Sequence, residues 1–549
     1  MDDAFLQEMA EGYAFDEPSL SLGAPMLGGE IAASAPVRLP LSMVNRHGLV
    51  AGATGTGKTK TLQIMAGQLS DAGVPVFVSD VKGDLTGLSQ PGDATAGPIV
   101  ERARQLGIAY EPKSHPVELL SLSGELGAQV RATVSSFGPI LLGKVLDLNK
   151  TQTSVLTLVF AYCDDQRLPL LDLADLRTTL KFLSSDEGKS TLEEYGGFSK
   201  ATIGVLLRSI VELEAAGADS FFGEPEFAVH DLMRSTDDGR GVVSLLELSD
   251  VMDRPRLFST FMLWMLAQLY AQLPEEGDLP KPKLAFFFDE AHLLFDDASE
   301  ALMEQIELTA RLIRSKGVGV YFVTQGPTDV PSSVLSQLGN RVQHALRAHT
   351  PEDESNLRKT VRTFPKSEHY DVGETLTSLG IGEALVTVLT PKGVPTPLAA
   401  TRLVPPDSLM DAVDAATRAQ LIASGSLQAK YAVAVDRESA HEIITARLNG
   451  AAEVVGQEAA TPLPPPPPGA PPAEEAAAPT PKPSRPAKTA PKPKTSAKPT
   501  TSGEPESGSD GGLADDVKDI GVGFAKDMLT TADGRRTLRT VFGALFGKK

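Results

Sequence analysis

Short apolar runs alternate with longer segments of helical periodicity between residue 46 and about residue 405. The apolar runs are nearly continuous and rich in β-branched or aromatic residues, which is typical of strands buried on both faces. They are residues 48–53, 74–81, 241–248, 283–290 and 319–325. Because helical segments separate these runs, the pattern predicts an α/β fold with a mainly parallel sheet.

The same pattern gives a domain organisation for the folded part. We expect residues 1–40 to be an irregular or lightly structured N-terminal lead-in and residues 41–405 to be the α/β domain. Within that domain, residues 95–240 are mainly helical and are interpreted as an insertion between core strands, including one long helix through residues 139–163. Residues 406–455 are expected to form closing helices.

The C-terminal part changes character. Residues 456–510 are rich in proline, alanine and lysine. Such a segment buries too little apolar surface to fold, so we expect a disordered linker. Residues 511–549 regain an apolar spacing of helical period, which predicts a C-terminal amphipathic helix.

Charge and cysteine content narrow the classes of function. The 549 residues carry a formal net charge of −20, which argues against a generally basic surface that coats nucleic acid. The single cysteine, Cys163, excludes an internal disulfide and a cysteine-based zinc site. No apolar run approaches the roughly 18 residues of a spanning helix, and the N-terminus lacks a secretory pattern. We therefore expect a cytoplasmic protein without a transmembrane segment.

A phosphate-binding loop is predicted where the first strand meets a helix. The pattern GxxxxGK[ST] is matched in full by Gly52, Ala53, Thr54, Gly55, Thr56, Gly57, Lys58 and Thr59, and Lys60 closes the predicted nucleotide-binding segment. Glycines let backbone N–H groups converge on phosphate oxygens, and the helix N-terminus adds partial positive charge. Lys58 is expected to reach the β- and γ-phosphates, and the Thr59 hydroxyl to ligate Mg²⁺. The predicted cofactors are thus ATP and Mg²⁺. The flanking strand and helix disfavour a chance match in a glycine-rich turn.

Two acids follow the apolar strand at residues 283–288. In P-loop enzymes a carboxylate at a strand end holds Mg²⁺, often through water, and this role falls to Asp289. Its neighbour Glu290 is expected to orient and deprotonate the attacking water. The alternative is an acidic strand end that caps the next helix. For His292, packing or hydrogen bonding is favoured over a catalytic role.

Two other strand ends carry polar groups. Asp80 or Asp84 could support Mg²⁺ through its water shell, or this segment could be a simple turn with Gly83 at positive φ. Gln325 is the last residue of the predicted strand 319–325. We expect it to sense the γ-phosphate or to orient water; the alternative is that it only begins a polar loop.

An arginine that stabilises the transition state is often supplied by another subunit. Arg314, on the helix before the last of these strands, is the first candidate and Arg341 the second. Arg311 and Arg347 are further candidates, and each arginine could instead be solvated or salt-bridged.

Four strings together resemble the HerA/FtsK class of P-loop ATPases, particularly the bacterial HerA-like helicase-domain proteins. They are NRHGLVAGATGTGKTKTLQ, VFVSDVKGDLTGL, FFFDEAHLLF and FVTQGPTDVPSSVLSQLGNRVQHALRA. The resemblance is close over residues 45–90 and 280–350, and the order of elements extends it over residues 25–405.

This resemblance implies a RecA-like core, hexameric rings with ATP sites at subunit interfaces, and translocation of double-stranded DNA through a central pore. It makes residues 41–405 the ATPase domain. Position by position, it implies Walker A residues Lys58 and Thr59, Walker B residues Asp289 and Glu290, a sensor glutamine, Gln325, and a trans-acting arginine, Arg314.

Two hypotheses of function follow, besides a slowly hydrolysing scaffold that the intact motifs oppose. The first is an ATP-hydrolysing homo-oligomeric ring motor, a hexamer, that acts on double-stranded DNA. The alternative is an ATPase motor or switch that acts on protein partners or at a membrane surface. For the alternative, the C-terminal tail would dock a protein partner or an anionic bilayer, although the terminal helix could also fold back on its own ring.

Overall fold

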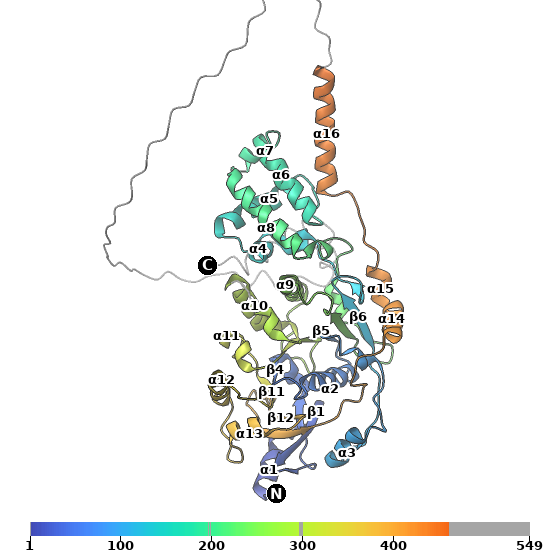
Figure 1. Cartoon of the computed structure of the whole chain (residues 1–549), viewed down its shortest axis with the longest axis vertical. Helices are drawn as coiled ribbons and strands as arrows, with labels where there is room; N and C mark the ends of the chain where they lie inside the picture. The colour runs from blue at the N-terminus through green and yellow to red at the C-terminus, as the bar shows by residue number, and fades with distance from the viewer. Residues whose placement is uncertain (1, 196, 198, 296–299, 460–549) are drawn as a thin grey trace, which may run out of the picture. The chain divides into compact units, whose positions relative to one another are not determined.

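The computed structural model describes residues 2–195, 197, 199–295 and 300–459 (Figure 1). The strands in this part are β1 (Ser19–Leu27), β2 (Glu30–Ile31), β3 (Val37–Pro40), β4 (Gly48–Ala51), β5 (Val76–Asp80), β6 (Val117–Ser121), β7 (Ala128–Gln129), β8 (Val243–Glu247), β9 (Leu284–Phe288), β10 (Val318–Thr324), β11 (Asn340–His344), β12 (Glu383–Thr387) and β13 (Ala399–Leu403). All five predicted strands are confirmed, as β4, β5, β8, β9 and β10.

The α-helices in the same part of the chain alternate with these strands. They are α1 (Asp3–Gly12), α2 (Lys58–Asp71), α3 (Gly97–Leu106), α4 (Val134–Val145), α5 (Lys150–Asp165), α6 (Leu173–Ser184), α7 (Lys189–Glu194), α8 (Lys200–Ala215), α9 (Pro255–Gln272), α10 (Glu300–Ile313), α11 (Ser332–Leu335), α12 (Pro351–Val361), α13 (Val372–Ser378), α14 (Ala415–Ser424), α15 (Ser426–Tyr431) and α16 (Ala440–Ala459). None of the helices in this part of the chain is both long enough and apolar enough to cross a membrane.

One sheet organises the fold, in the order β2-β1-β13-β12-β11-β4-β10-β9-β5-β8-β6-β7, with β3 paired to β1. The strands from β11 to β7 in this order are parallel, whereas β12, β13 and β1 join the other side antiparallel. The predicted α/β fold with a mainly parallel sheet is therefore confirmed. We call the side where the parallel strands end the carboxyl edge, and the side where they begin the amino edge.

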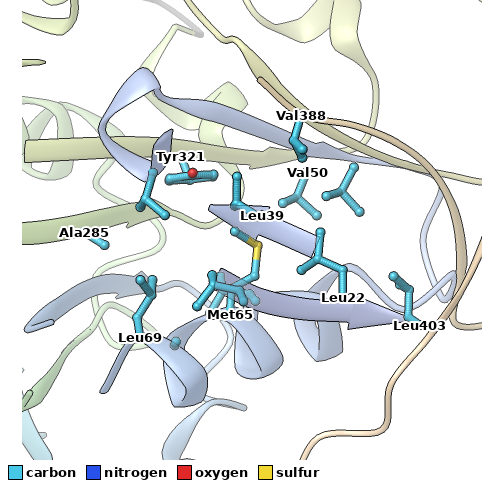
Figure 2. Packing of buried hydrophobic residues seen from close by; sticks show 14 of the residues in the cluster. Leu22, Leu39, Val50, Met65, Leu69, Ala285, Tyr321, Val388 and Leu403 are labelled. Atoms are coloured by element: carbon cyan, nitrogen blue, oxygen red, sulfur yellow. The ribbon is translucent and has the colours of Figure 1, made fainter. Parts of the chain in front are cut away.

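The N-terminal segment has more regular structure than the irregular or lightly structured lead-in that we expected. It contains α1 and three strands, and β1 pairs with β13, so that Gly23 lies opposite Leu403. Figure 2 shows Leu22 of β1 packed together with Met65 of α2 and Val50 of β4 in one buried cluster. The segment is ordered because it covers the core of the sheet, and its partner strand lies about 380 residues later in the chain, as Gly23 opposite Leu403 shows.

The prediction of one long helix through residues 139–163 is wrong. The structure has two helices, α4 and α5, and Asn149 begins the second one. The Gln152 N–H donates to the Asn149 side-chain oxygen at 3.0 Å, and the Asn149 N–H donates to Gln152 Oε1 at 2.9 Å. This capping box, together with positive φ at Asp147, ends one helix and starts the next.

Residues 95–240 contain the helices α3 to α8, of which α4 to α8 follow one another after β7. Figure 1 shows α5, α6 and α8 close together in one helical group. The same stretch also supplies β6 and β7 to the end of the sheet, so the main sheet runs into the region that we expected to be an insertion.

The described chain closes with α14, α15 and α16. A compact unit extends to Thr445, and a second unit begins at Ala446, of which the structure describes only the rest of α16. The predicted linker at 456–510 lies almost wholly outside the described residues, and the predicted terminal helix at 511–549 lies wholly outside them.

Candidate active site

The glycine-rich loop lies between the end of β4 and the start of α2, at the carboxyl edge. Gly57 precedes α2 with φ of 112°, a conformation that glycine adopts without strain. Gly52 allows a close approach, since a Cβ there would lie 2.4 Å from Cβ of His344. The loop is tied to its neighbours because the Ala53 N–H donates to the Ala345 carbonyl at 2.8 Å. These contacts hold the backbone in a fixed, narrow turn.

Lys58 is the first residue of α2, directly after this loop, and is only 8 % exposed. Its ammonium group donates to the carbonyl oxygens of Gly52 at 2.7 Å and Ala53 at 3.3 Å. An ammonium group has three N–H donors, so one remains for an anion. Burial lowers the pKa of Lys58, and the charge of Glu290 opposes that shift. The lysine is therefore a partly desolvated cation close to acids.

The two residues that follow Lys58 differ in their surroundings. Thr59 is half-buried in the first turn of α2. The Lys60 ammonium donates to the carbonyl of Met410, in the segment before α14. The side chain of Lys60 is thus bound to the C-terminal segment. If Lys60 contributes to nucleotide binding as predicted, it does so through its backbone.

Asp289 follows β9 at the same edge of the sheet and is 2 % exposed. Its backbone N–H donates to the Ser79 hydroxyl at 3.2 Å. Its Oδ2 atom is buried and has no hydrogen-bond partner among the described residues. Burial, then the charges of Glu290 and Asp80, raise the pKa of Asp289 to about 7. A carboxyl group in this state gains most from a nearby cation.

Glu290 is 7 % exposed and adopts a left-handed backbone conformation, with φ of 46°. Residues other than glycine seldom adopt this conformation, and it recurs at functional sites. Lys82 Nζ donates to Glu290 Oε1 at 2.5 Å, and His292 Nδ1 lies 3.4 Å from Oε2. Burial would lower the pKa of Lys82, but its hydrogen bond to Glu290 and the charge of Glu290 raise it. Lys82 thus fixes the direction of this carboxylate, while His292 lies close to Glu290 without a hydrogen bond to it.

The Asp80 segment forms the turn that we considered as an alternative, with Gly83 at φ of 70°. The carboxylate of Asp80 is fully buried and accepts from the N–H groups of Gly83 at 2.7 Å and Leu85 at 2.9 Å. Burial, then the charge of Asp84, raise the pKa of Asp80. Asp80 therefore holds its own turn at the carboxyl edge.

Sequence reasoning missed Glu247, which ends β8 directly opposite Asp80. It is fully buried, and neither of its carboxylate oxygens has a hydrogen-bond partner among the described residues. Burial and the charge of Asp80 raise its pKa. The signal was present in the sequence, since GVVSLLEL is an apolar strand that ends in an acid, as LAFFFDE is.

Gln325 lies at the end of β10, between β4 and β9, and is exposed. The turn after it is held by Asp329, whose Oδ2 accepts from the Thr324 hydroxyl and from the Gly326 N–H, both at 2.7 Å. The sheet order thus places Gln325 between Lys58 and Asp289. Asp329 is a second residue that the sequence did not single out.

The candidate arginines are not gathered at this site. Arg314 opens the short turn at Arg314–Lys316 before β10, so it lies at the amino edge, across the sheet from the loop. Arg341, in β11, donates to the carbonyl of Thr363 at 3.1 Å. Arg347 is exposed just after β11 and donates to Thr377 at 2.8 Å, while Arg311 is exposed in the last turn of α10. Within one subunit, Arg314 cannot reach the glycine-rich loop.

A nucleotide with Mg²⁺ fits the residues at the carboxyl edge. The loop offers backbone N–H groups and a lysine to phosphates, and the unpartnered Oδ2 of Asp289 offers an oxygen to a cation. No cluster of three or more histidine, cysteine or acidic residues in the described ranges could hold a metal alone. Mg²⁺ in ATPase sites uses one or two protein ligands together with phosphate and water, so Thr59 and Asp289 stay the predicted ligands.

Comparison with curated proteins finds two relatives that have the same name. The chain is 21 % identical to the DNA double-strand break repair helicase HerA of Sulfolobus acidocaldarius over 367 residues, covering 67 % of each chain. It is 22 % identical to the protein of that name from Saccharolobus solfataricus over 368 residues, covering 66 % of this chain and 65 % of the relative. The chain thus spans about two thirds of the length of these curated relatives.

Solved structures are similar at lower identity. The bacterial conjugative coupling protein TrwBdeltaN70 matches with a TM-score of 0.44 and 16 % identity, over 74 % of this chain and 91 % of that one.

The model of the helicase HerA-like C-terminal family matches residues 27–549, which is nearly the whole sequence. The chain therefore belongs to the helicase HerA-like C-terminal family of P-loop ATPases.

Proposed function

We propose that this chain is the subunit of a ring motor that hydrolyses ATP with Mg²⁺ and translocates double-stranded DNA. The observation that carries the proposal is the convergence of Lys58 with Asp289 and Glu290 at one edge of the sheet. These groups come from β4–α2 and from β9, two strands away, and they form a buried site of opposite charges. A family of helicases and relatives that repair DNA breaks support DNA as the substrate.

The residues of the chain would divide the work as follows. Lys58 and N–H groups between Thr54 and Thr59 would hold the phosphates, and Thr59 with Asp289 would hold Mg²⁺. Mg²⁺, when bound, neutralises negative charge on the phosphates. Glu290 would accept a proton from the attacking water at its carboxylate, whose direction Lys82 sets. Gln325 would orient that water.

The position of Arg314 bears on assembly. Because it lies at the amino edge, it can act on hydrolysis only at the site of a neighbouring subunit. A closed homo-oligomer, for which we propose a hexamer, would bring such an arginine to each site.

The test is the rate of ATP hydrolysis by pure protein without DNA, with single-stranded DNA and with double-stranded DNA, together with oligomer size by light scattering. We expect Mg²⁺-dependent hydrolysis that double-stranded DNA stimulates, and a mass of several subunits. Lys58→Ala should remove hydrolysis under all three conditions. A rate that no DNA changes would leave an ATPase but contradict the proposed substrate, and would favour an ATPase that acts on protein partners or at a membrane surface.

A further inference from the structure

The two flanks of the glycine-rich loop differ in chemistry. On one side, β10 and β9 bring Gln325, Asp289 and Glu290 to the carboxyl edge. On the other side stand β11 and then β12, which is antiparallel to β11. Since β12 runs in the opposite direction, the loop that precedes it, residues 379–382, also lies at the carboxyl edge. This loop, which we call the β12 loop, flanks the glycine-rich loop on the side away from the acids.

The β12 loop contacts the glycine-rich loop directly. The Gly382 N–H donates to the Thr56 carbonyl at 3.0 Å. A Cβ added at Gly57 would lie 3.3 Å from the Gly382 nitrogen, which shows how closely the two backbones approach. The β12 loop therefore lies directly beside the glycine-rich loop at Thr56 and Gly57.

Arg102 of α3 fixes the conformation of the β12 loop. Its Nη1 donates to the Gly382 carbonyl at 2.9 Å and its Nη2 to the Ile381 carbonyl at 3.0 Å. The Gly380 N–H donates to Glu383 Oε2 at 2.8 Å. Gly382 has φ of 69°, and a Cβ there would lie 2.1 Å from Arg102 Nη1, so a larger residue would displace the guanidinium group from this position. The loop is thus held at both carbonyls and at its start.

The side chain presented by this fixed loop is apolar and exposed. Ile381 is 72 % exposed, the second-highest exposure among the large hydrophobic residues described as exposed. A rigid backbone that holds an aliphatic group in water next to a phosphate-binding loop is preorganised for an apolar part of the ligand.

We propose that Ile381 contacts the face of the nucleotide's purine base, and that Arg102 acts as a positioning residue through the β12 loop. The proposal rests on the proposed function, because it takes the ligand of the glycine-rich loop to be a nucleotide. A nucleotide is elongated, and its terminal phosphate must lie on the side of Asp289 and Glu290. Its base then lies towards the other flank, where the β12 loop places Ile381. A purine face is apolar and gains from losing water against an aliphatic side chain.

The experiment compares two ligands by titration calorimetry with the full chain in Mg²⁺ buffer: ADP, which has a base, and tripolyphosphate, which has none. Ile381→Ala should weaken ADP binding about three- to tenfold, in line with the loss of a few partly buried methyl or methylene groups. Tripolyphosphate binding should change less than twofold. Ile381→Leu should restore ADP binding, since it keeps an aliphatic group of the same size. Val394→Ala is the matched control, because Val394 is also exposed but lies in the turn between β12 and β13 at the amino edge.

Arg102→Ala tests the positioning role and should weaken ADP binding by a similar factor with tripolyphosphate binding retained. Unchanged ADP affinity in Ile381→Ala would overturn the inference and leave the proposed function intact. Equal losses for ADP and tripolyphosphate would also overturn it, because the loop would then support the phosphates alone. If the wild-type protein bound neither ligand, the proposed function itself would fail, and this inference with it.

Discussion

The two edges of the sheet differ in whether their charged side chains are exposed and paired or buried and unpaired. At the amino edge, basic residues that precede the strands pair with acids of the 273–283 connection, as in Arg46 with Asp278 at 3.3 Å and Lys283 with Glu276. Lys316 lies 3.9 Å from Glu275, and the acids at 275 and 278 are largely exposed. Such pairs in solvent contribute little energy and need no special function.

At the carboxyl edge the charges are buried, and acids outnumber their basic partners. Asp289 and Glu247 have oxygens without hydrogen-bond partners in the part of the chain that the structure describes, and burial raises the pKa of both. Burying unpaired carboxyl groups costs free energy, so they are retained where they serve a ligand or a reaction. The contrast indicates that one edge is a surface and the other a reaction site.

Arg314→Ala gives the largest expected effect, because it is the one change at the amino edge that should affect hydrolysis. If the arginine acts on a neighbouring subunit, turnover should fall about 10³-fold while ATP affinity stays unchanged. The measurement is steady-state hydrolysis together with nucleotide binding. Mixing the variant with wild-type protein should lower the rate more than dilution does. A linear dependence on the wild-type fraction would show that subunits work independently, and the amino edge would then be surface alone.

Glu290→Gln should reduce turnover about 10²-fold or more, since the amide cannot accept the proton from water. Nucleotide binding should persist, because Lys58 and residues 52–59 are untouched. Rapid-quench hydrolysis and binding of labelled ATP measure the two effects. Glu276→Gln, at the amino edge, is the matched control and should behave as wild type. Wild-type turnover in Glu290→Gln would remove Glu290 from the role of base.

Lys82→Ala should lower turnover by a smaller factor, about tenfold, in the range measured when groups that orient a functional residue are removed. The lysine holds Oε1 of Glu290, so its loss should reduce kcat with little change in KM. Lys113→Ala is the control. Lys113 lies away from the site, its Nζ is 3.1 Å from Asp71 Oδ2, and its side chain is about as exposed as that of Lys82. Equal effects of the two changes would mean that Lys82 contributes general surface charge and does not orient Glu290.

These residues also show how far the sequence alone could go. The glycine-rich loop, the Asp289–Glu290 pair and Gln325 each follow a strand directly, so a local pattern predicts where they lie. The pairing of Lys82 with Glu290 joins residues 208 positions apart, and no local pattern contains it. Their roles in catalysis stay predictions, whereas their convergence at one edge is a property of the fold.

The fold itself divides in the same way. Five parallel strands, β4, β5, β8, β9 and β10, were predictable because each is a continuous apolar run, while β1 and β3 were missed because they are ordered by β13 and by the core under α2. The parallel strands β6, β7 and β11 were also missed. The break between α4 and α5 was missed for another reason. Its signal, the Asn149 capping box, is local, but the apolar spacing on both sides masked it. Glu247 likewise has a local signal, because it is an acid at the end of an apolar strand.

Glu247→Gln, the smallest expected effect, tests the carboxyl edge through stability. Burial and the charges of Asp80, Asp250 and Asp84 raise the pKa of Glu247 above its unfolded value, and Arg418 opposes this shift. The folded state therefore binds the proton more tightly than the unfolded state does, and this stabilisation is lost as pH rises towards the folded pKa. The amide carries no charge at any pH, so its advantage in Tm over wild type should grow between pH 5 and pH 8.5, to about 2–4 °C, without nucleotide or Mg²⁺.

Differential scanning calorimetry across this pH range measures that advantage, with Glu276→Gln as the control. Glu276 already has Lys283 as a partner at the amino edge, so its amide should bring no gain that increases with pH. If Glu247→Gln shifted Tm by the same amount at every pH, Glu247 would be ionised normally in the folded protein. The buried carboxyl group of Glu247 would then be as well compensated by positive charge as the exposed acids of the amino edge. The contrast between the two edges would be lost.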